Sequence, residues 1–115
     1  MPAVVPHVSR IATQLTGSRE YTDHSARVLT QSRTVRFREM EYAIPANNVA
    51  AAFDELRAVI KRKRWNISFP VEVRFAAADD LMLSTAHGRE TAYIAGHRYW
   101  REDPSEYFRA VEEIM

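Results

Sequence analysis

The strictest constraint on the fold is a run of alternating side chains, FPVEVRFA, at residues 69–76. A period of two is typical of a β-strand with one buried face and one open face. The run therefore predicts a strand over residues 69–77, with Glu72 and Arg74 side by side on the open face. Its buried face would consist of Phe69, Val71, Val73 and Phe75.

Length and composition exclude several classes of protein. A chain of 115 residues makes one small domain with a single core. A net charge of +1 gives no general attraction to nucleic acid. The absence of cysteine excludes a disulfide scaffold, a thiolate metal site and a cysteine nucleophile, and it suits a cytoplasmic protein, with or without association with a membrane surface. No run is apolar enough to predict a transmembrane segment or a signal peptide.

The N-terminal part predicts little regular structure. Residues Val5 to Leu15 form an amphipathic pattern that predicts a short helix stopped by Gly17. Residues 18–34 are polar and predict a loop, with at most a short extended piece around Val28 and Leu29.

Two more strands and two more helices are expected beyond residue 34. Residues 35–45 and 90–100 read as strands; a shift of apolar phase in the first indicates a bulge or partial cover on both faces. Residues 46–64 form the clearest helix, capped by Asn47 or Asn48, with its apolar stripe at Val49, Phe53, Leu56, Val59 and Ile60. A last helix follows Asp103 as cap and Pro104, with its apolar face at Tyr107, Phe108, Val111 and Ile114.

This order of elements predicts an α+β fold, in which helices cover a small, mainly antiparallel sheet. Residues 1–34 are expected to be an N-terminal helix and polar loop, and residues 35–115 the α+β domain.

Three groups of residues are candidates for a site, and each has a structural alternative. Glu72 and Arg74 are either an exposed ion pair or a site for an oxygen-rich ligand, since the guanidinium fork matches paired oxygens. His97 shares a strand face with Tyr93, Ala95 and Tyr99 and is either a packed side chain or a ligand contact. The four histidines lack metal-ligand spacing, so no metal site is expected, and Asp79-Asp80 is expected to end a strand and hydrogen-bond into the following loop.

Two features of the sequence bear on nucleotide and nucleic-acid binding. Lys61–Arg64 reads as the solvated basic end of a helix, and no nucleic-acid partner is expected. The chain contains only three glycines, so no glycine-rich phosphate loop is predicted and no cofactor-binding residue is assigned.

Three segments taken in order resemble a known family. VRFREMEYAIP, FPVEVRFAAADDLMLSTAHGRETAYIAGHRY and EYFRAVEEIM are similar to sequences of the sugar-lactone oxidases. This family comprises D-arabinono-1,4-lactone oxidase and L-gulono-1,4-lactone oxidase or dehydrogenase, and is related to alditol oxidase. The resemblance implies a flavoprotein of the vanillyl-alcohol-oxidase type, of which residues 35–115 look like the substrate-binding cap domain.

The resemblance implies roles for the charged pair. Glu72 and Arg74 would bind hydroxyl and carbonyl oxygens of a sugar-lactone or polyol substrate, and Arg74 would stabilise charge that develops as a hydride leaves for FAD. Both are thus expected to be catalytic and substrate-binding, with His97 as a further substrate contact.

The chain departs from the family pattern at both ends. These 115 residues contain neither the family's flavin-binding domain nor its His-Trp-x-Lys motif. We therefore expect a cap-domain piece, incomplete at its C-terminus, of an FAD-dependent oxidoreductase whose flavin domain lies upstream. The alternative is a stand-alone, non-catalytic module that binds a small sugar acid or a protein partner. Self-association through an uncovered sheet face is a third expectation.

Overall fold

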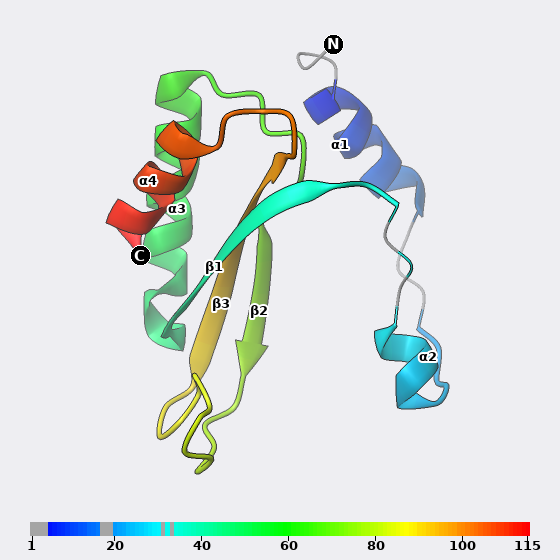
Figure 1. Cartoon of the computed structure of the whole chain (residues 1–115), viewed down its shortest axis with the longest axis vertical. Helices are drawn as coiled ribbons and strands as arrows, with labels where there is room; N and C mark the ends of the chain where they lie inside the picture. Colours follow the sequence, from blue (N-terminus) through cyan, green and yellow to red (C-terminus); the bar gives the residue numbers. More distant parts are fainter. Residues whose placement is uncertain (1–4, 17–19, 31, 33) are drawn as a thin grey trace.

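The computed structural model describes residues 5–16, 20–30, 32 and 34–115. Within these residues a three-stranded antiparallel sheet carries two helices on one face (Figure 1). The expected α+β class is confirmed. The elements in chain order are α1 Val5–Thr16, α2 Ser25–Leu29, β1 Phe37–Pro45, the 3-10 turn η2 Ala46–Asn48, α3 Val49–Lys63, β2 Glu72–Ala76, β3 Thr91–Tyr99 and α4 Ser105–Ile114.

The sheet is built around β3. Its strand order is β1-β3-β2, so β3 pairs with both neighbours and β1 and β2 form the edges. The pairing of β1 with β3 runs without interruption from Phe37↔Tyr99 to Pro45↔Thr91. The expected bulge in residues 35–45 is therefore absent. The phase shift reflects partial cover on both faces, because Phe37 packs on one side of the sheet and Ile44 lies in the core on the other.

The core lies between the sheet and the two C-terminal helices. Apolar side chains recur on the inner faces of α3 and α4 at helical spacing, which is what an amphipathic helix needs to cover a sheet. The core residues are Ile44, Ala52, Leu56, Ala92, Ile94, Tyr107 and Val111. The predicted stripe of α3 is confirmed at Leu56 and Val59, whereas Ala52 is more deeply buried than Phe53.

Gly96 allows α4 to approach β3 closely. A Cβ atom at this position would lie 3.1 Å from Tyr107 Oη and 3.3 Å from its Cε1. Such contacts are tighter than a packed core ordinarily accepts. The absence of a side chain at Gly96 is therefore what lets Tyr107 lie against the sheet.

The helix termini agree with the sequence predictions in part. Asn48 precedes α3 but makes no side-chain cap hydrogen bond, because the backbone of η2 leads directly into the helix. Asp103 does act as a cap: its Oδ1 accepts hydrogen bonds from the Ser105 backbone N–H and hydroxyl at 3.0 and 2.7 Å. At the end of α3, Arg64 takes the left-handed conformation that closes a helix (φ 54°).

The N-terminal region corrects one prediction and supports another. The first helix is confirmed as α1, while its expected stop, Gly17, lies outside the described residues. Where an extended piece was expected around Val28 and Leu29, the chain forms the short helix α2. Its first turn is held locally, since the His24 carbonyl accepts from two backbone N–H groups and Asp23 pairs with Arg27 at 3.6 Å.

The strand predicted over residues 69–77 is shorter than expected, and two of its apolar residues were misplaced. Strand β2 begins at Glu72, because Pro70 lacks the N–H group that a sheet ladder needs. The ring of Phe69 lies against Phe37 and His97, on the face opposite the helices. Phe75 is 66% exposed at the sheet edge instead of anchoring the core.

Candidate functional site

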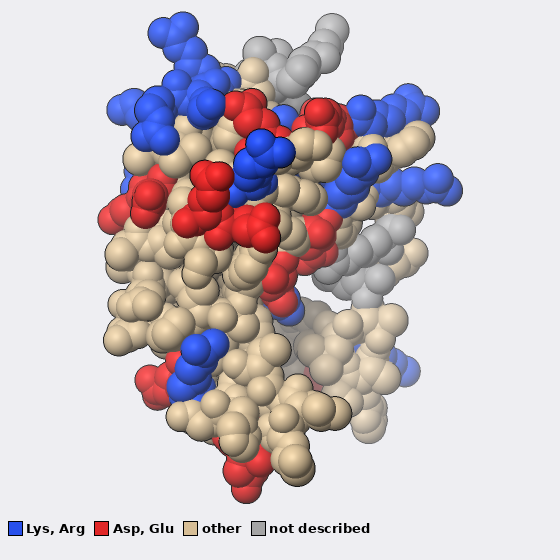
Figure 2. Space-filling view, turned by 60° about the vertical axis from the view of Figure 1, so that its left-hand side comes forward, with Lys and Arg blue, Asp and Glu red and all other residues tan. Residues whose placement is uncertain are grey.

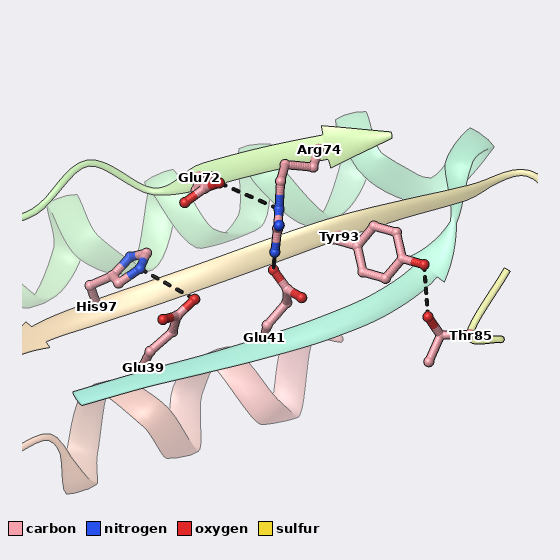
Figure 3. Close-up of polar contacts among 7 residues, drawn as sticks. All are labelled: Glu39, Glu41, Glu72, Arg74, Thr85, Tyr93 and His97. Atoms are coloured by element: carbon pink, nitrogen blue, oxygen red, sulfur yellow. Dashed lines mark hydrogen bonds and ion pairs between the residues drawn. The ribbon is translucent and has the colours of Figure 1, made fainter. Parts of the chain in front are cut away.

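A row of polar side chains covers the sheet face that the helices leave open (Figure 3). The register places Glu39 beside His97 and sets Ala95 between Glu41 and Glu72. Arg74 lies beside Tyr93 in the same way. The alternation of strand side chains thus brings charged groups from all three strands to one surface.

Arg74 is the centre of this polar row. Its Nη2 donates a hydrogen bond to Glu41 Oε2, and its Nε lies 3.4 Å from Glu72 Oε1. Its guanidinium carbon lies 5.9 Å from the centre of the Tyr93 ring. The hydrogen bond to Glu41 and the charge of that carboxylate raise the pKa of Arg74 above its ordinary value. The guanidinium is therefore a fixed, permanently charged donor that two carboxylates orient.

His97 lies farther along the row and is buried. Its Nε2 is 3.4 Å from Glu39 Oε1, and only 7% of its side chain is exposed. The rings of Phe37 and Phe69 pack on it with centroids 5.1 and 6.1 Å away. The expectation of an uncovered sheet face is wrong at His97 and Ala95, because neighbouring side chains bury both residues.

The loop between β2 and β3 closes the other end of the row. Tyr93 Oη and Thr85 Oγ1 share a hydrogen bond of 2.7 Å. Asp79 orders the loop, since its carboxylate accepts from the Leu81 N–H at 3.1 Å and from the Ser84 hydroxyl at 2.5 Å. This confirms the structural interpretation of the Asp79-Asp80 pair at Asp79.

Two hollows flank the charged pair. One, of about 220 Å³, is lined by Glu41, Arg74, Phe75 and Tyr93. The other, of about 360 Å³, is lined by Phe37, Phe69, Pro70, Val71, Glu72 and His97. Each combines apolar surface with a few polar groups, which is the character of small-ligand sites. Together they give a ligand access to Arg74 and Glu72 from both sides.

The chemistry available here is hydrogen bonding to oxygen. Carboxylates accept from hydroxyl groups, and a guanidinium donates to carbonyl or ring oxygens. Three carboxylates, those of Glu39, Glu41 and Glu72, outnumber the one guanidinium. The surface therefore favours an uncharged, hydroxyl-rich ligand over an anion.

The sequence predicted part of this arrangement. Glu72 and Arg74 do lie together, and His97 shares their face, next to Glu39. The two β1 carboxylates and the Thr85–Tyr93 link were missed. The alternation FREME at residues 37–41 was the available signal, because it places Glu39 and Glu41 on one strand face.

Other candidate chemistry finds no support in the described part of the chain. None of the described residues form a group of three or more His, Cys, Asp or Glu side chains able to hold a metal ion. The basic end of α3 is solvent-exposed, and Lys63 donates to Glu106 at 2.7 Å. Figure 2 shows Lys and Arg gathered at the end of the molecule where α3 finishes, with Asp and Glu beside them. Within the described ranges, no helix is both long and apolar enough to cross a membrane.

The described residues do not fit the diphosphate of a dinucleotide cofactor. Such a cradle needs glycine-rich backbone that opens a helix. Gly96 lies within β3 against Tyr107, and Gly88 lies in a loop that leads into a strand. Neither of these glycines is followed by a helix N-terminus.

The fold and the polar row define a small α+β unit with a surface for an oxygen-rich ligand. Comparison with known proteins identifies the family. A family model described as D-arabinono-1,4-lactone oxidase matches residues 1–115, and the chain belongs to this family.

Curated relatives carry related names. L-gulono-1,4-lactone dehydrogenase of Mycobacterium tuberculosis is 46% identical over 114 residues, which are 99% of this chain and 27% of the relative. The L-gulonolactone oxidases of Scyliorhinus torazame and Bos taurus are each 29% identical over 122 residues, covering the whole chain and 28% of each relative. The chain thus spans about a quarter of the length of these relatives. No solved structure gives a significant match.

Proposed function

We propose that this chain supplies the substrate-facing surface of an FAD-dependent oxidoreductase that oxidises a sugar-1,4-lactone. Residues 35–115 would be its substrate domain. The observation that carries the proposal is the position of Arg74, held between two carboxylates and flanked by two hollows on the open face of the sheet. The names of the relatives supply the substrate class.

In this proposal Arg74 donates hydrogen bonds to the carbonyl or ring oxygen of the lactone. It would also stabilise the negative charge that develops on the substrate hydroxyl oxygen as this group loses its proton and the carbon loses a hydride, which is the use of a preorganised donor in catalysis. Glu72 and Glu41 hold the guanidinium in place and offer acceptors to the sugar hydroxyls. His97 borders the second hollow and contributes to the same surface.

The family resemblance implies FAD as the electron acceptor. Since the described residues offer no cradle for its diphosphate, the proposal assigns FAD binding to a part of the oxidoreductase outside these 115 residues. The 115-residue chain alone would then retain no flavin and catalyse no oxidation.

The test is to express the reading frame that contains these residues together with its flanking coding sequence, and to assay L-gulono-1,4-lactone and D-arabinono-1,4-lactone with an artificial electron acceptor. We expect lactone-dependent reduction by the extended chain and none by residues 1–115. Flanking DNA that encodes no flavin-binding segment would instead favour a stand-alone, non-catalytic module. Stoichiometric FAD retained by residues 1–115 through gel filtration would contradict the assignment of cofactor binding.

A further inference from the structure

Glu39 and His97 form a second pair in the polar row, two residues along the strands from the Arg74 cluster (Figure 3). The two side chains differ in exposure: 37% of Glu39 is open to solvent, against 7% of His97. Glu39 is therefore the more open member of the pair, while the His97 ring lines the wall of the hollow beside Glu72.

The surroundings of His97 restrict what its ring can do. Nδ1 is buried and has no hydrogen-bond partner among the residues that the structure describes. Phe37 and Phe69 pack on the ring. A hydrogen on Nδ1 would be a buried donor without an acceptor, which is costly, so the hydrogen belongs on Nε2, where Glu39 can accept it. Nε2 is thus directed at Glu39 and Nδ1 has no access to a ligand.

We propose that Glu39 is a substrate-binding residue of the polar row and that His97 is a positioning residue that acts through it. This inference rests on the proposed function. His97 Nε2 holds Glu39 Oε1 through their 3.4 Å contact. Glu39 Oε2 makes no hydrogen bond to any described residue and stays available as an acceptor. Glu39 and Glu41 are two residues apart on β1, about 6.6 Å along the strand. That spacing suits separate hydroxyl groups of one polyhydroxylated lactone.

The experiment uses the complete oxidoreductase polypeptide with L-gulono-1,4-lactone as the probe. The variants are Glu39→Gln, His97→Phe and the double variant, with Arg74→Lys as reference and Glu55→Gln, exposed on α3, as the matched control. Phenylalanine keeps the aromatic packing around position 97 and removes Nε2. The measurements are kcat, KM and the thermal midpoint of each variant.

We expect Glu39→Gln to raise KM by about tenfold or more, because a hydrogen bond to a charged acceptor is lost, and to leave the thermal midpoint unchanged. His97→Phe should raise KM to a similar extent in the parent and by less than twofold in the Glu39→Gln background. Glu55→Gln should change neither constant. An equal effect of His97→Phe in both backgrounds would show that His97 acts independently of Glu39 and would overturn the inference.

Two further outcomes separate the inference from the proposed function. If Arg74→Lys impairs turnover while Glu39→Gln leaves KM within twofold, the inference fails and the proposed function stands. If the complete polypeptide oxidises no lactone, both fail. Should His97→Phe not fold, 15N NMR of the unsubstituted ring decides: a hydrogen on Nε2 supports the positioning role, and a hydrogen on Nδ1 overturns it.

Discussion

Arg74 on edge strand β2 reaches across the central strand to donate a hydrogen bond to Glu41 on β1, the opposite edge of the sheet. The distance between the outer strands is about 9.6 Å, so this contact needs an extended arginine side chain. Glu72 holds the near end of the guanidinium and Tyr93 lies under it. One side chain therefore connects all three strands across the face that we propose to bind substrate.

The geometry makes Arg74 irreplaceable by lysine. In the extended oxidoreductase that we propose, Arg74→Lys should lower kcat/KM on the order of 10²-fold, since a single ammonium group cannot serve Glu41, Glu72 and a substrate oxygen together. The thermal midpoint should change little, because 54% of the side chain is exposed. Steady-state kinetics and thermal melts would check this. The control is Arg57→Lys, because Arg57 forms an exposed ion pair with Asp54 on α3. Near-normal turnover of Arg74→Lys would show that Arg74 is only a member of a surface ion pair.

The periodicity of apolar residues predicted the elements in which it is strong. It failed to predict contacts between residues that lie far apart in the sequence. The stripe of α3 predicted a buried face that the fold confirms at Leu56 and Val59, and the strand predicted at residues 90–100 is confirmed as β3. The alternation at residues 69–76 misplaced Phe69 and Phe75, because Pro70 delays the start of β2 and the helices do not cover the edge of the sheet at Phe75. Glu41 was missed as a partner of Arg74 because their contact joins strands 33 residues apart, and register decides which residues meet.

Leu56 in the core and Phe75 at the sheet edge should contribute unequally to stability. Leu56→Ala should reduce the free energy of unfolding of the 115-residue chain by about 2–5 kcal/mol, because Leu56 is fully buried between α3 and the sheet. Phe75→Ala should change it by less than about 0.5 kcal/mol, since the ring is largely in solvent. Urea denaturation measures both. A cost at Phe75 comparable with that at Leu56 would mean that the ring packs in the core after all.

The contact of Gly96 with Tyr107 predicts that a side chain at position 96 destabilises the fold and that a change at Tyr107 restores part of the stability. Gly96→Ala should destabilise the chain by about 1–3 kcal/mol, because the added methyl group meets Tyr107 Oη at 3.1 Å and ring atom Cε1 at 3.3 Å. Tyr107→Phe should recover part of this loss by removing Oη, which is buried and bonds to none of the described residues. Burial also raises the pKa of Tyr107.

Gly88 provides the matched control for this double-variant cycle. A Cβ atom there would meet nothing within 4 Å, but its φ of +69° costs an L-residue about 1–2 kcal/mol. Tyr107→Phe should therefore leave the cost of Gly88→Ala unchanged. Equal recovery in both backgrounds would show that the Tyr107 hydroxyl is not the source of the strain at Gly96.

Acid should weaken the start of α4. The side-chain and backbone hydrogen bonds from Ser105 lower the pKa of Asp103 below its ordinary value. A carboxylate whose pKa is lower in the folded state stabilises the fold above its unfolded pKa, and this contribution is lost as pH falls through the folded pKa. Asp103→Asn should thus lower the thermal midpoint at pH 7 and lose less stability than the parent as the pH drops below about 4. Asp54→Asn on α3 is the control, and parallel acid profiles of parent and Asp103→Asn would contradict the prediction.

Self-association should depend on the tip of the loop between β2 and β3. Leu81, Met82 and Leu83 are 64%, 93% and 99% exposed, although hydrogen bonds to Asp79 hold the loop in one conformation. An ordered apolar tip in water lowers its free energy by contact with another surface. The double variant Met82→Ser/Leu83→Ser should therefore reduce light scattering and the sedimentation coefficient of the 115-residue chain at high concentration. Leu29→Ser, at a residue of α2 that is also highly exposed but lies outside this loop, should reduce neither. If the double variant associates as strongly as the parent, the contact must lie elsewhere, with the polar row of the sheet as the next surface to substitute.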